Sequence, residues 1–112
     1  NETQAITAAN NLLDAGADGF QGVQETVDTK VDVPALRELK TQTGKPPVIV
    51  GSVSSVTTMP FGTPADVCAD VRRCKALAAD KGGGWLLNFS SSLGPEVPCE
   101  NIHAFYREAV AD

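Results

Sequence analysis

Polar side chains that could bind a small ligand gather directly after two apolar segments of the chain, 47–51 and 85–89. The candidates are, in chain order, Ser52, Ser54, Asn88, Ser90, Ser91 and Ser92. Hydroxyl and amide groups donate hydrogen bonds, so these side chains could hold a carboxylate or a bound water. The same residue types are also typical of tight turns, so a purely structural role stays open for each of them.

Other reactive side chains form no recognisable site. Cys68, Cys74 and Cys99 are odd in number, and their spacings of six and 25 residues match no zinc motif. We interpret them as free thiols in a reducing compartment, which predicts a cytoplasmic protein. His103 falls on the last predicted helix, away from the strand ends, so a Ser-His-Asp hydrolase is not supported. Glycines 82–84 precede a strand, whereas a phosphate-binding loop follows one.

Composition and charge exclude some partners. Hydrophobic residues make up 42% of the 112 residues, which is enough for one domain with a real core. The formal net charge of −5 repels a polyanion, so we expect no nucleic-acid partner. No run of about 18 apolar residues occurs, so we expect no membrane span. The first residue is Asn1 rather than Met, so we expect that the natural start was trimmed or lies upstream.

The hydrophobic pattern predicts alternating helices and strands. Helices are expected at 3–15, 33–42, 63–79 and 99–110, and strands at 18–23, 47–51 and 85–89. The clearest helix start is Thr63-Pro64-Ala65-Asp66, which offers an N-cap hydroxyl, a proline in the first turn and an acidic residue at N3. Arg72, Arg73 and Lys75 on that helix are expected to form a solvated face. The continuous apolar run at 47–51 predicts a strand that is buried on both faces.

Strands that alternate with helices predict an α/β fold with a parallel sheet. Three strands leave two open edges, and parallel sheets are normally covered on both faces. A closed barrel has eight strands and about 250 residues, so we expect the chain to be an incomplete part of such a barrel. A second copy or further sequence would complete the core. A small doubly wound sheet is the alternative.

Three sequence blocks resemble the uroporphyrinogen decarboxylase superfamily, and they occur in the family's order and spacing. Residues 60–67, PFGTPADV, resemble the family's L-P-F-G-T-P-E-E-V. Residues 82–88, GGGWLLN, resemble G-G-G-F-I-L, and residues 94–102, GPEVPCENI, resemble P-D-V-P-P-E-N-I. The resemblance implies that residues 1–112 are the C-terminal three βα units of a (β/α)8 TIM barrel, an incomplete parallel sheet flanked by helices.

The resemblance implies two chemistries. One branch decarboxylates the acetate side chains of uroporphyrinogen, in porphyrin and heme biosynthesis, without a cofactor. The other branch transfers a methyl group from a cobamide, usually with zinc. Residues 27–32, VDTKVD, and 51–54, GSVS, resemble motifs of this methyltransferase branch, so both a tetrapyrrole and a methyl-corrinoid remain possible substrates. A third possibility is an inactive fragment or assembly piece that needs a second copy or the N-terminal part of the barrel.

The resemblance also singles out Ser91 as the catalytic position. The decarboxylases carry a substrate-facing histidine there, and the methyltransferases carry a zinc-binding cysteine. Serine is a poor zinc ligand and does not titrate as histidine does, so we expect no metal ligand at this position. The predicted substrate-binding residues around it are Ser52, Ser54, Asn88, Ser90 and Ser92.

Overall fold

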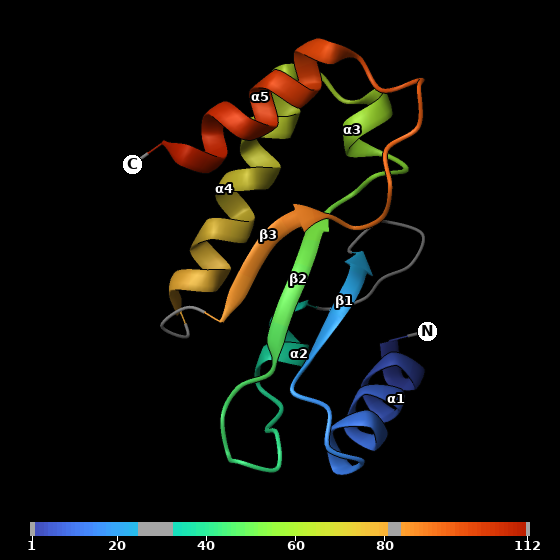
Figure 1. Cartoon of the computed structure of the whole chain (residues 1–112), viewed down its shortest axis with the longest axis vertical. Helices are drawn as coiled ribbons and strands as arrows, with labels where there is room; N and C mark the ends of the chain where they lie inside the picture. Colours follow the sequence, from blue (N-terminus) through green and yellow to red (C-terminus); the bar gives the residue numbers. More distant parts are fainter. Residues whose placement is uncertain (1, 25–32, 81–83, 112) are drawn as a thin grey trace.

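The computed structural model describes residues 2–24, 33–80 and 84–111. Strands and helices alternate along the chain, and Figure 1 shows α4 and α5 gathered at one end of the molecule and α1 at the other. The elements are α1 (Glu2–Asp14), β1 (Gly19–Gln24), α2 (Val33–Arg37), β2 (Val48–Val53), α3 (Thr58–Phe61), α4 (Pro64–Asp80), β3 (Trp85–Phe89) and α5 (Cys99–Val110).

The strands form one parallel sheet in the order β1-β2-β3. In register, Gln21 lies opposite Val50, and Val50 lies opposite Leu86. The predicted α/β class, with a parallel sheet flanked by helices, is therefore confirmed. Since the strands are parallel, their carboxyl ends meet at one edge of the sheet, where the loops after β1, β2 and β3 begin.

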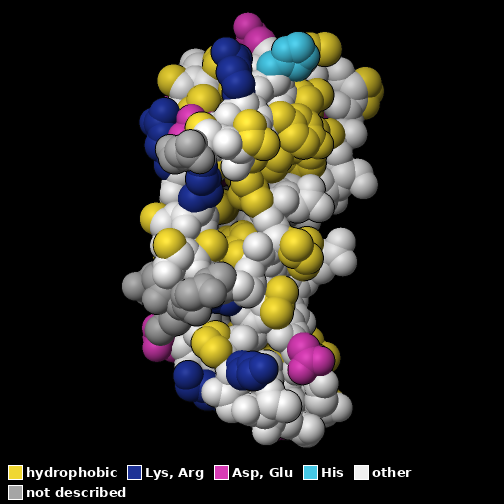
Figure 2. Space-filling model, turned by 60° about the vertical axis from the view of Figure 1, so that its left-hand side comes forward, with side chains coloured by type: hydrophobic (Ala, Val, Ile, Leu, Met, Phe, Trp, Pro, Cys, Tyr) yellow, Lys and Arg dark blue, Asp and Glu magenta, His cyan; other side chains and the backbone are white. Residues whose placement is uncertain are grey.

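The hydrophobic core lies between one face of the sheet and the helices α4 and α5. Its buried members are Val53, Met59, Val67, Val71, Cys74, Val97, Ala104 and Phe105. Alternate residues of β3 point toward this core, and Phe89 contacts the ring of Phe105 with a centroid distance of 4.4 Å. On the surface, Figure 2 shows hydrophobic side chains gathered mainly in the upper part of the view, with others scattered below.

The opposite face of the sheet is open among the described residues, so the prediction that the strand at 47–51 is buried on both faces is wrong. Val48 is exposed and Val50 is half-buried. On β3, the side chain of Leu86 is 63% exposed. The continuous apolar run signals a sheet face that the described helices do not cover.

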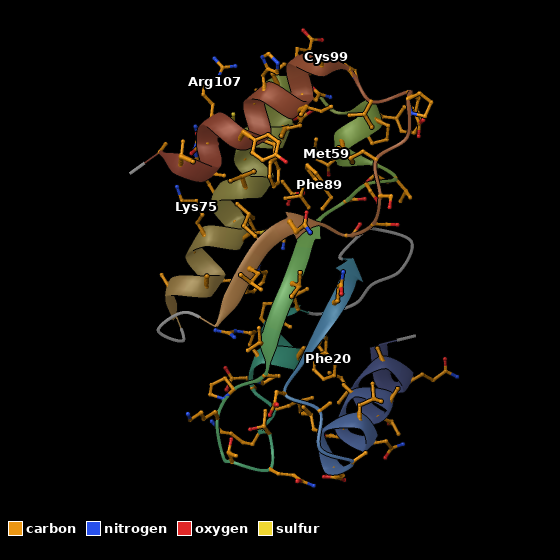
Figure 3. The ribbon with its side chains drawn as sticks, in the orientation of Figure 1. Phe20, Met59, Lys75, Phe89, Cys99 and Arg107 are labelled. Carbon is orange, nitrogen blue, oxygen red and sulfur yellow. The ribbon has the colours of Figure 1, made fainter. Side chains whose placement is uncertain are left out.

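Two polar arrangements hold α4 in place. At its start, the Thr63 amide donates to Asp66 Oδ2 (2.8 Å) and the Asp66 amide donates to Thr63 Oγ1 (3.2 Å), as the predicted capping motif requires. Further along, Arg72 pairs with Glu108 on α5 at 2.7 Å. Lys75 donates to the Glu108 carbonyl at 3.0 Å (Figure 3). Arg72 and Lys75 therefore join α4 to α5, whereas Arg73 pairs with Asp70 within α4. The predicted solvated face is right for the exposed Arg72 side chain but leaves out these contacts.

Two other expectations differ from the structure. The segment between the predicted strand at 47–51 and the predicted helix at 63–79, for which no helix is expected, contains α3, which ends where the Gly62 amide donates to the Thr58 carbonyl (2.9 Å). The helix expected at 33–42 ends at Arg37. Beyond it the chain forms tight turns, because the amides of Glu38 and Leu39 bond to carbonyls three residues back. Among the described helices, none has the length and apolar character needed to cross a bilayer.

Candidate functional site

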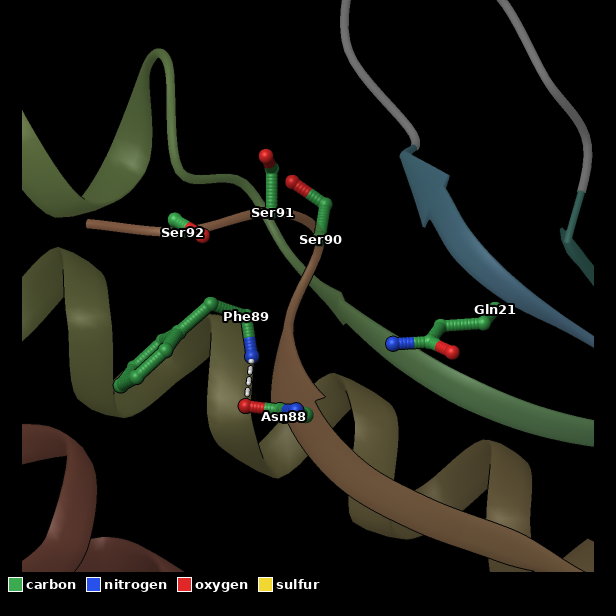
Figure 4. Close-up of a pocket in the computed structure, with 6 residues that line it drawn as sticks. All are labelled: Gln21, Asn88, Phe89, Ser90, Ser91 and Ser92. Atoms are coloured by element: carbon green, nitrogen blue, oxygen red, sulfur yellow. Dashed lines mark hydrogen bonds between the residues drawn. The ribbon is translucent and has the colours of Figure 1, made fainter.

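A polar pocket lies at the carboxyl ends of β1 and β3. It is lined by Gln21, Asn88, Phe89, Ser90, Ser91 and Ser92 (Figure 4). Its volume of about 380 Å³ is at the small end of the range for ligand sites, so it fits one polar group of a larger molecule. The structure thus brings together four of the six predicted site residues: Asn88, Ser90, Ser91 and Ser92.

The serine turn, defined as residues 90–92, is anchored to the loop after β2. The Ser90 amide donates to the Val53 carbonyl at 2.8 Å, which extends the contact between β2 and β3. Ser90 Oγ accepts a hydrogen bond from the Ser55 amide at 3.1 Å and lies 3.2 Å from Ser55 Oγ. Ser90 is buried, whereas Ser91 and Ser92 are exposed. Ser91 and Ser92 are therefore the hydroxyl groups of the turn that a ligand can reach.

Two amide side chains complete the pocket wall. Asn88 Oδ1 accepts a hydrogen bond from the Phe89 amide at 2.8 Å, so the oxygen is turned toward the backbone and the side-chain nitrogen can donate elsewhere. Gln21, on β1, is exposed and lies on the other side of the pocket from the serine turn (Figure 4). The two amide groups approach the same space from two strands that are not neighbours in the sheet.

Ser52 and Ser54 do not line this pocket. Ser52 is fully buried, and its Oγ lies 3.8 Å from the Sγ of Cys74 on α4. The alternation of β2 changes just before it, at Gly51, whose φ of 144° is open mainly to glycine. Ser54 is buried because its Oγ accepts hydrogen bonds within its own loop, including the Thr57 amide at 3.1 Å. Ser52 therefore packs β2 against α4, and Ser54 stabilises the loop after β2.

From the sequence, the segments 21–26 and 52–59 are expected among the strand-end loops that line part of the pocket, but neither Gln21 nor Ser55 is singled out as a site residue. Gln21 lies in the middle of β1, in the sheet row of Val50 and Leu86. No sequence pattern identified Ser55, because its contact with Ser90 joins residues 35 positions apart.

The lining side chains of the pocket are hydroxyl, amide and aromatic groups, none of which carries a charge near neutral pH. Zinc prefers thiolate, imidazole and carboxylate ligands, so this donor set does not fit a zinc ion. Over the described ranges, no group of three or more His, Cys, Asp or Glu side chains is arranged to hold a metal. The motif at 27–32 lies outside the described residues. The arrangement suits the binding of an acceptor group, above all a carboxylate.

The thiol of Cys74 is buried against β2. Burial raises the pKa of the Cys74 thiol above its ordinary value, and the hydrogen bonds with Ser52 oppose that shift. Cys68, Cys74 and Cys99 are all free thiols, and only Cys99 is exposed. None of the three lies in the polar pocket, so the thiols are not part of this site.

The chain is thus an α/β protein with a parallel sheet and a polar pocket beside the loop after β3. Comparison with protein families gives a more specific result. The family model for uroporphyrinogen decarboxylase (URO-D) matches residues 3–111, so the chain belongs to the uroporphyrinogen decarboxylase family. Searches of curated proteins and of solved structures gave no match.

Proposed function

We propose that the chain forms the last three βα units of a (β/α)8 barrel that decarboxylates acetate side chains of a tetrapyrrole. The observation that carries the proposal is the pocket of uncharged donors at the carboxyl ends of β1 and β3. In such a barrel, ligands bind at this end of the strands. The open sheet face, with Leu86 63% exposed, supports the barrel because the inner faces of barrel strands are covered by other strands.

In this proposal Ser91 and Ser92 donate hydrogen bonds to one carboxylate of the substrate, and the amide groups of Asn88 and Gln21 orient it. Such donors bind and position a carboxylate without taking its charge away. Loss of carbon dioxide breaks the bond between the carboxylate and the side-chain carbon, and a proton must replace it there. A serine hydroxyl is too weak an acid to give up its proton near neutral pH. That proton therefore comes from a group other than Ser91.

We further propose a small-molecule substrate, a cytoplasmic location and no nucleic-acid partner. The net charge of −5 and the free thiols support these points. No cofactor is part of the proposal, because the donor set of the pocket suits a carboxylate rather than zinc. A homo-oligomer or a separate N-terminal part of the barrel would supply the remaining strands.

The test is porphyrin binding to the 112-residue chain. Quenching of the single Trp85 is followed with uroporphyrin and with coproporphyrin, in which methyl groups replace the acetate groups. We expect tighter binding of uroporphyrin. Ser91→Ala should weaken it about tenfold, as expected for one hydrogen bond to a charged group. Thr7→Ala, which removes an exposed hydroxyl on α1, is the control.

Three results would speak against the proposal. Equal affinity for the two porphyrins would show that the acetate groups are not recognised. An unchanged affinity in Ser91→Ala would remove the proposed contact. Zinc bound at one ion per chain, measured by mass spectrometry, would favour the methyltransferase branch instead. Formation of coproporphyrinogen by the purified chain would extend the proposal from binding to catalysis.

A further inference from the structure

The serine turn is held by a residue that does not line the pocket. Ser90 Oγ contacts Ser55 twice, through the Ser55 amide at 3.1 Å and through the Ser55 hydroxyl at 3.2 Å. Both serines are at least nine-tenths buried, so these bonds are made away from bulk water. Ser90 directly precedes Ser91 in the chain. The position of Ser55 therefore influences the position of the Ser91 hydroxyl.

The loop that carries Ser55 is firmly fixed. Ser54 Oγ accepts from the Thr57 amide and hydroxyl at 3.1 and 2.8 Å, and the Met59 amide donates to the Ser54 carbonyl at 3.0 Å. Met59 is itself fully buried in the core, and Asn101 Nδ2 donates to its carbonyl at 2.8 Å. The loop that carries Ser55 is therefore packed against the core, whereas Ser91 is exposed on the serine turn.

We propose that Ser55 is a positioning residue for the pocket: it fixes Ser90, and through Ser90 it holds the Ser91 hydroxyl in the orientation that meets the substrate carboxylate. This inference rests on the proposed function, because it concerns the same pocket. Hydrogen bonds between buried neutral groups are directional, so the Ser55–Ser90 pair restricts the side-chain rotamer and the backbone of the turn. Without that pair, part of the binding free energy is spent on ordering the turn.

The test combines Ser55→Ala with Ser91→Ala in a double-mutant cycle on uroporphyrin affinity. Ser55→Ala removes the hydroxyl contact but leaves the donation from the Ser55 amide to Ser90 Oγ, so alone it should weaken binding about fivefold, the effect of one neutral hydrogen bond. In the Ser91→Ala background the same change should have little effect, because the hydroxyl that Ser55 positions is gone. Ser55→Thr, which keeps a hydroxyl, should recover much of the affinity. The control is Thr41→Ala, which removes another buried hydroxyl, bonded to Thr43 far from the pocket.

Amide hydrogen exchange gives a readout that does not need the ligand. Ser55→Ala should speed exchange at residues 91 and 92 more than at β1, whereas a general loss of stability would speed exchange throughout. If wild-type protein binds uroporphyrin and Ser55→Ala changes neither affinity nor this exchange, the positioning role is overturned. Equal effects of Ser55→Ala with and without Ser91 would also overturn it. A wild-type chain that does not bind uroporphyrin overturns the proposed function and the role of Ser55 toward substrate together.

Discussion

Replacement of Asn101 tests whether its two hydrogen bonds hold α3 to α5 beside the loop that carries Ser55. Asn101 is fully buried in the first turn of α5, and its Nδ2 donates to the carbonyls of Met59 and Gly62 at 2.8 and 2.9 Å. Asn101→Ala leaves both carbonyls without this donor. An unsatisfied buried group costs about 1–3 kcal/mol, and the Gly62 bond is only partly buried, so we expect a loss of about 2–4 kcal/mol in the free energy of unfolding.

Urea unfolding followed by Trp85 fluorescence measures this loss. Asn101→Asp is the informative partner, because it keeps the side-chain volume but replaces the donor by an acceptor that faces two carbonyls. We expect it to cost at least as much as Asn101→Ala. Asn11→Ala, on the exposed side of α1, should change stability by less than about 0.5 kcal/mol. A loss below that value for Asn101→Ala, or a milder effect for Asn101→Asp, would refute the argument that the two donations hold α3 to α5.

Three further predictions concern packing and thiol chemistry. Gly19→Ala should lower stability by about 1–3 kcal/mol in the same urea assay, because the added methyl group would lie 2.8 Å from the Cβ of Val48; an unchanged midpoint would contradict this. Iodoacetamide at pH 8 should label the exposed Cys99 well before the buried Cys74, as peptide mass spectrometry would show. Because burial raises the pKa of Cys74, its thiol stays neutral in the folded chain while the unfolded chain ionises above pH about 8.5. The stability that this group contributes is therefore fully present below that pH and is lost as the pH rises. Between pH 7 and pH 9.5, the free energy of unfolding should fall more for wild type than for Cys74→Ala. Equal losses in the two proteins would contradict the prediction.

Local patterns were sufficient for most of the fold. The capping sequence at Thr63 and the apolar stripe of α4 depend on neighbours within one or two turns, so they could be found in the sequence. Strand β3 was predicted at its observed bounds for the same reason. The short helix α3 was missed because its Met59 is held by long-range packing and by Asn101. Leu12 and Leu13 both fit the helical spacing of α1, but Leu12 is exposed and Leu13 is buried, so periodicity alone does not define the packed face.

The candidate site was harder to predict from the sequence than the fold. The serine turn could be predicted because it follows a strand, and loops after parallel strands meet at one edge of the sheet. Gln21 depends on the register between β1 and β2, which single-sequence patterns do not set. The positions of Ser52 and Ser54 depend on whether each hydroxyl bonds to its own loop or turns toward solvent. That competition is decided only when the strands have packed.

Burial separates the serines of this region into two groups with different roles. A buried hydroxyl has to find its hydrogen-bond partner inside the protein, so its capacity is used before any ligand arrives. The buried group consists of Ser52, Ser54, Ser55 and Ser90. Ser52 contacts Cys74 on α4, whereas Ser54, Ser55 and Ser90 fix the two loops after β2 and β3. Ser91 and Ser92 are exposed, so their hydroxyls keep donor capacity for a ligand. If the proposed function is correct, the buried serines determine the geometry of the pocket, and the exposed pair determines which group binds there.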